Sequence, residues 1–161
     1  MSTPRALKDS VRPRRLYGAS GRPLNFTVRG HGRAGGNVKR YDPNRAPEPA
    51  EWLELDEEER IALVERFHRK MPEHAQSLKA HAIVHAAVET QLALNDPPGA
   101  RYALTRLMGE GLDRHEALHA IGSVLAEYLF EALRGSGAKD TSNDAYAQAL
   151  LRLTAASWRA L

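Results

Sequence analysis

The chain has 161 residues, of which 42% are hydrophobic and 27% are charged, as is typical of a globular protein with one domain or one domain and a tail. It contains no cysteine, which excludes disulfides, thiolate zinc sites, iron–sulfur clusters and cysteine nucleophiles. Any metal site must therefore use His, Asp and Glu. No apolar run approaches the ~20 residues of a membrane-spanning helix.

The formal net charge of +3 is the average of two unlike segments. Residues 1–45 contain eleven Lys and Arg against two Asp, a net charge of +9, whereas residues 46–161 contain twelve basic and eighteen acidic residues, a net charge of −6. The first segment is rich in Gly and Pro and has no helical or strand period, so we expect a disordered basic arm. Such an arm can bind nucleic acid or an acidic partner through its charge, or remain a solvated tail.

From Ala46 onward the apolar residues follow a helical period, which predicts a folded domain over residues 46–161. Asp56 and Asp113 are typical helix N-caps, and Asn95 with the prolines behind it is a typical stop signal. No alternating β-branched run competes with this pattern. The sequence predicts an all-α bundle of about five helices, over about residues 57–68, 73–94, 100–108, 114–133 and 143–158.

Four of the seven histidines form two pairs with i, i+4 spacing, His81 with His85 and His115 with His119. The members of such a pair lie about 40° apart around a helix, so both side chains project from one face on adjacent turns. Each pair falls on the apolar stripe of its predicted helix, so we expect both pairs to point into the bundle, between two long helices. The remaining histidines, at positions 31, 68 and 74, are assigned no role, and His68 is expected at a helix end.

Buried imidazoles need partners for both ring nitrogens, and a divalent metal satisfies one nitrogen on each ring. We therefore predict that the two pairs bind a divalent metal, most simply zinc, with an open water position. His115 to His119 also reads His-Glu-x-x-His, in which Glu116 acts as a base toward zinc-bound water, as in a zinc-dependent hydrolase, or as a further ligand. Glu89 lies at the edge of the stripe that carries His81 and His85. It is a candidate to accept a hydrogen bond from the ring nitrogen of a histidine that does not bind the metal.

Two alternatives stay open at this point. Glu116-x-x-His119 fits half of the ligand set of a carboxylate-bridged di-iron bundle, so iron ranks second to zinc. The histidines can instead be structural core residues, in a non-catalytic interaction module whose basic arm binds nucleic acid or an acidic partner.

The motifs also resemble a known family. They are His81-x-x-x-His85 with Gln91 following, the pair Pro97-Pro98, Arg114-His115-Glu116-x-x-His119 with Glu127 downstream, and the stretch from Tyr41 to Pro47 that leads to Trp52. Together, over residues from about Tyr41 to Leu133, they resemble bacterial proteins classed under domain of unknown function 1841 or a close relative. The resemblance implies a small helical cytoplasmic protein and no established activity.

Overall fold

The computed structural model describes residues 40–71, 77–135 and 142–160, and every regular element in these ranges is a helix. This confirms the predicted all-α class. Residues 1–39, which make up most of the predicted basic arm, lie outside the described ranges. The expected binding of nucleic acid or an acidic partner through this arm therefore stays a prediction. The helices are α1 (Pro49–Glu54), α2 (Glu57–His68), α3 (Leu78–Leu94), α4 (Pro98–Gly109), α5 (Arg114–Arg134), α6 (Asn143–Arg152) and α7 (Ala155–Arg159).

The two helices that carry predicted N-caps begin as the sequence predicts. Asp56 accepts a hydrogen bond from the N–H of Glu59, whose carboxylate accepts one from the N–H of Asp56, and this capping box starts α2. Asp113 and Glu116 form the same reciprocal pair at the start of α5. α5 ends at Arg134 and is followed by Gly135, whose φ of 58° is the left-handed conformation that glycine adopts without strain.

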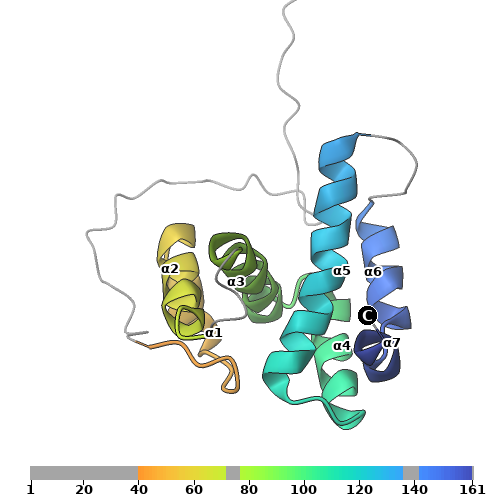
Figure 1. Ribbon diagram of the computed structural model, residues 1–161, viewed down its shortest axis with the longest axis horizontal. Helices are drawn as coiled ribbons and strands as arrows, with labels where there is room; N and C mark the ends of the chain where they lie inside the picture. The colour runs from red at the N-terminus through yellow and green to blue at the C-terminus, as the bar shows by residue number, and fades with distance from the viewer. Residues whose placement is uncertain (1–39, 72–76, 136–141, 161) are drawn as a thin grey trace, which may run out of the picture. The chain divides into compact units, whose positions relative to one another are not determined.

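Helix α3 lies between α2 and α5, and α5 also contacts α4, α6 and α7 (Figure 1). Gly122 allows α5 to approach α3 closely, because a Cβ atom at this position would lie 3.2 Å from Val84 Cγ1. Two apolar clusters fill the spaces between the helices. One joins α3 to α4, α5 and α6 around Leu107, Ile121 and Leu150, and the other joins α1, α2 and α3 around Trp52 and Val64. α3 therefore belongs to both clusters.

The structure differs from the prediction in two elements. α1 was not predicted, because its six residues are too short for a helical period to be recognised. The predicted fifth helix is divided into α6 and α7, because the hydroxyl of Thr154 accepts a hydrogen bond from the N–H of Ser157 and starts a new helix. The predicted start of α3 near Glu73 falls within residues 72–76, outside the described ranges.

Two residues ahead of Ala46 are part of the packed core. Tyr41 is only 4% exposed and contacts Trp52 and Phe67 through its ring. Pro43 is fully buried as well. Tyr41 and Pro43, which the charge pattern assigned to the basic arm, therefore belong to the packed core.

None of the helices in the described ranges has both the length and the apolar character that crossing a membrane requires.

Candidate metal centre

Five histidines from three helices gather where α2, α3 and α5 meet. His68 is the last residue of α2, His81 and His85 lie on successive turns of α3, and His115 and His119 lie on the first turns of α5. The ring centroids of the two predicted pairs face one another, at 4.9 Å for His81 and His119 and 5.3 Å for His85 and His115. All four predicted ligands thus lie together, and a fifth ring joins them.

Four of these rings offer nitrogen atoms that lie within 4.8 Å of one another: His68, His85, His115 and His119. We call these four residues the histidine group. In a tetrahedral zinc site with Zn–N bonds of about 2.0–2.1 Å, the ligand nitrogens lie roughly 3.3 Å apart. The rings would therefore have to shift from their present positions before all four nitrogens could bind one ion. His81 lies beside the group, with its ring centroid 4.4 Å from that of His68.

The backbone sets the orientation of the His68 ring. Its Nδ1 lies 2.9 Å from the carbonyl oxygen of Val64, one turn earlier in α2. A carbonyl only accepts hydrogen bonds, so Nδ1 carries a proton and, in the neutral ring, Nε2 carries the lone pair. That Nε2 lies 2.9 Å from Nε2 of His115. Two nitrogens that face each other at this distance either share one proton or bind one cation.

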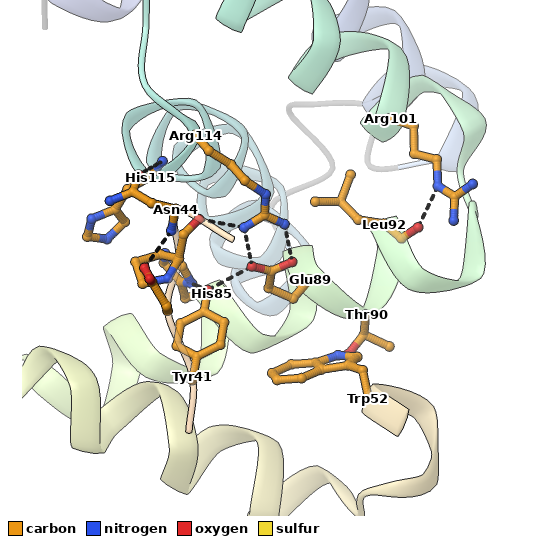
Figure 2. Close-up of polar contacts among 12 residues, drawn as sticks. Tyr41, Asn44, Trp52, His85, Glu89, Thr90, Leu92, Arg101, Arg114 and His115 are labelled. Carbon is orange, nitrogen blue, oxygen red and sulfur yellow. Dashed lines mark hydrogen bonds and ion pairs between the residues drawn. The ribbon is translucent and has the colours of Figure 1, made fainter. Parts of the chain in front are cut away.

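A chain of hydrogen bonds holds the ring of His85 from the side opposite the group (Figure 2). Arg114 forms a bidentate ion pair with Glu89, with N–O distances of 2.8 and 2.7 Å. Oε1 of Glu89 accepts a hydrogen bond of 2.8 Å from the Tyr41 hydroxyl, which lies 3.0 Å from Nδ1 of His85. The side chains of Glu89 and Arg114 are 1% and 8% exposed, so this chain lies in the protein interior.

This chain determines which nitrogen of His85 carries the proton. Burial, followed by the negative charge of Glu89, raises the pKa of Tyr41 well above its ordinary value, so the hydroxyl stays protonated and donates a hydrogen bond to Glu89. The hydroxyl oxygen then accepts from Nδ1–H of His85, which leaves the lone pair on Nε2. Burial, together with the neighbouring histidines, lowers the pKa of His85 far below its ordinary value, so the ring is neutral. Its Nε2 is buried and has no hydrogen-bond partner in the described part of the chain.

Hydrogen bonds connect the segment that carries Tyr41 to the start of α5. A turn forms over Asp42, whose side chain accepts from the N–H of Asn44 at 3.0 Å. Arg114 donates to the carbonyl of Pro43, and the side-chain oxygen of Asn44 accepts from the N–H of His115 at 3.4 Å. The same Arg114 therefore holds both the backbone beside Tyr41 and the carboxylate that Tyr41 contacts.

The two predicted carboxylates lie outside the histidine group. Glu116 is exposed, and its side chain accepts a hydrogen bond of 2.9 Å from the N–H of Asp113 in the capping box of α5. Glu89 reaches His85 only through Tyr41. The helical position of Glu89 at the edge of the histidine stripe was therefore a useful signal, although the intervening tyrosine was not predicted.

Sequence reasoning also gave no role to His68, although a signal for it was present. His68 follows Val64 by four residues and Ile61 by seven, which places it on the apolar stripe of its helix. Tyr41 and Arg114 had no such periodic signal, since Tyr41 precedes the first helix and Arg114 occupies a capped helix start, and only the motifs of the family resemblance included them.

Comparison with protein families finds a match over most of the helical part of the chain. Residues 47–152 match the family model described as domain of unknown function (DUF1841). Comparison with curated proteins and with solved structures found no match.

Proposed function

The chain belongs to the DUF1841 family, a domain of unknown function, and we propose that it is a small metal-binding protein whose histidine group holds a zinc ion. The proposed ligands are His68, His85, His115 and His119, which offer nitrogen atoms within 4.8 Å of one another. His81 is an adjoining ring rather than one of the four.

The observation that carries this proposal is the lone pair on Nε2 of His85. The hydrogen bond to Tyr41 uses the outer nitrogen of the ring, and the inner nitrogen is buried without a hydrogen-bond partner in the described ranges. Leaving a buried polar atom unsatisfied costs about 1–3 kcal/mol. A metal ion at the group would satisfy this atom. The chain from Tyr41 to Glu89 and Arg114 is the outer hydrogen-bond support that metal-bound histidines ordinarily have.

The donor set favours zinc over the di-iron alternative. A carboxylate-bridged di-iron site requires several glutamates among its ligands. In the described part of the chain, the group of potential ligands contains only histidines. Glu116, the carboxylate on which the di-iron interpretation depends, contributes to the capping box of α5. Imidazole ligands suit zinc, copper, iron and nickel, and zinc commonly takes four ligands in a tetrahedron.

That the protein is a zinc-dependent hydrolase with Glu116 as its base stays a prediction. A catalytic zinc ion needs a position open to water, whereas four protein ligands close the tetrahedron. A hydrolytic role would also require the Glu116 carboxylate to leave the N–H of Asp113 and reach a zinc-bound water. The geometry therefore supports metal binding more directly than it supports catalysis.

Elemental analysis of the purified full chain tests the proposal. We expect about one zinc per chain in the wild type, and a large loss in His68→Ala and His85→Ala, since each removes one of four ligands. His31→Ala, in the basic segment, is the matched control and should keep its zinc. Substoichiometric zinc in the wild type, or unchanged zinc in both ligand variants, would overturn the proposal in favour of histidines that only pack.

A further inference from the structure

A pocket of about 390 Å³ opens beside the histidines, between α3 and α5. Three of its lining residues are His81, His85 and His119, and Trp158 of α7 contributes a further part of its wall. His85 is the member whose inner nitrogen carries the lone pair described above. The pocket therefore reaches the proposed metal centre from the side of α3 and α5.

Apart from these histidines, the pocket is mainly apolar. Val84 and Leu118 form part of its inner wall, and Ala80 of α3 and Ala126 of α5 lie at exposed positions among the residues that line it. Small side chains on both helices leave room for an occupant at this place. A volume of this size, with apolar walls and a few convergent polar groups, is characteristic of pockets for small organic molecules.

The side of the pocket formed by the histidines limits the chemistry of such an occupant. Among the residues that the structure describes, none that lines the pocket is Lys, Arg, Asp or Glu, so these walls offer a strongly charged molecule no opposite charge. An occupant would face the histidines with one part of its surface, and the rest of its surface must be compatible with Val84, Leu118 and Trp158. A molecule with an apolar body and a single donor atom meets both conditions.

We infer that this pocket is a ligand site for a small, mainly apolar organic molecule that directs one donor atom toward the metal at the histidine group, where it would bind as a fifth ligand to a zinc ion that expands from four to five ligands. This inference rests on the proposed function, because the donor atom needs the metal as its partner. It adds to that function a class of ligand and the path by which the ligand reaches the ion.

Calorimetric titration of the zinc-loaded full chain tests the inference with two probes that share one donor group. Imidazole and 4-phenylimidazole differ by an apolar ring, and burying that ring should make 4-phenylimidazole bind about tenfold tighter or more. Ala126→Phe and Ala80→Phe place a bulky ring at the pocket from opposite helices, at exposed positions that tolerate it, and should remove this preference. Ala132→Phe, an exposed position on α5 away from the pocket lining, is the matched control and should keep it.

The zinc content of each sample separates the two ideas. Zinc-loaded protein that binds both probes equally, or keeps the preference in both pocket variants, would overturn the ligand inference and leave metal binding intact. A preference that persists at the same strength after zinc is removed would also overturn it, since the donor atom would then have no role. A chain that takes up no zinc would overturn the proposed function and this inference together.

Discussion

Replacing Tyr41 with phenylalanine removes one hydroxyl and keeps the ring that packs against Trp52 and Phe67. The hydroxyl lies 3.0 Å from Nδ1 of His85 and donates to Glu89 at 2.8 Å, so its loss leaves Nδ1–H of His85 without its acceptor. At a site only 4% exposed, water cannot readily replace that acceptor. We expect the variant to unfold with a free energy lower by about 1–3 kcal/mol.

The effect on metal affinity is the more informative part of this prediction. Removal of an outer hydrogen-bond partner of a metal-bound histidine typically weakens metal binding about 10–100-fold, which corresponds to roughly 1.4–2.7 kcal/mol. Competition for zinc against a chelator of known affinity measures this change in Tyr41→Phe. Tyr102→Phe is the control, because Tyr102 is 59% exposed and far less constrained by its surroundings. A zinc affinity of Tyr41→Phe equal to that of the wild type would refute the assignment of Tyr41 as support for His85.

Three further predictions concern stability. Glu116→Ala should lower the free energy of unfolding by about 1 kcal/mol, because the capping box of α5 is lost, while the zinc content stays constant. Glu116→Gln should restore stability, because glutamine can also complete a capping box. Loss of zinc in Glu116→Ala would instead make Glu116 a ligand. Glu89→Ala should cost about 3–5 kcal/mol in thermal or urea denaturation, because Arg114 is left buried without its ion pair, and a cost below about 1 kcal/mol would contradict that account. Burial raises the pKa of Tyr146 to about 12. Between about pH 10 and 12 the unfolded chain therefore loses a proton that the folded chain keeps, and stability should fall with rising pH by up to about 2.7 kcal/mol. In urea titrations across this window Tyr146→Phe should show a correspondingly smaller fall, and a fall as steep as in the wild type would exclude Tyr146 as its source.

Much of the fold follows from local signals in the sequence. Asp56 and Asp113 predicted the starts of α2 and α5, and both form capping boxes in the structure. These signals are local because a cap involves only the next three residues of the chain. The break between α6 and α7 was missed because the apolar period continues through Leu153 to Trp158, while a single hydroxyl at Thr154 decides where the new helix begins.

Helical periodicity predicted which histidines of the candidate site share one face of a helix, but not which helices pack together there. The i, i+4 spacing of His81 with His85 and of His115 with His119 predicted two inward pairs, and these face each other across α3 and α5. Periodicity within one helix does not say which other helix packs against it. For that reason the contribution of His68 from α2 could not be derived without the tertiary structure, even though its place on the apolar stripe was visible.

The supporting hydrogen bonds depend on residues far apart in the chain. Tyr41 precedes His85 by 44 positions and Glu89 by 48, and it belongs to a segment without regular structure. Nothing in the composition of that segment distinguishes a tyrosine that supports a histidine from one in a solvated tail. The Tyr41 hydroxyl lies next to His85 because hydrogen bonds connect this segment to Arg114 and to the start of α5.

The central claim is that the histidine group binds zinc, and the stoichiometry of zinc in the purified full chain tests it most directly. Elemental analysis of the wild type should give about one zinc per chain, and the double variant His85→Ala, His119→Ala should give close to none, because half of the tetrahedral ligand set is removed. A wild-type chain that is folded and contains no zinc after incubation with excess metal and desalting would contradict the claim. Equal zinc in the wild type and the double variant would contradict it as well.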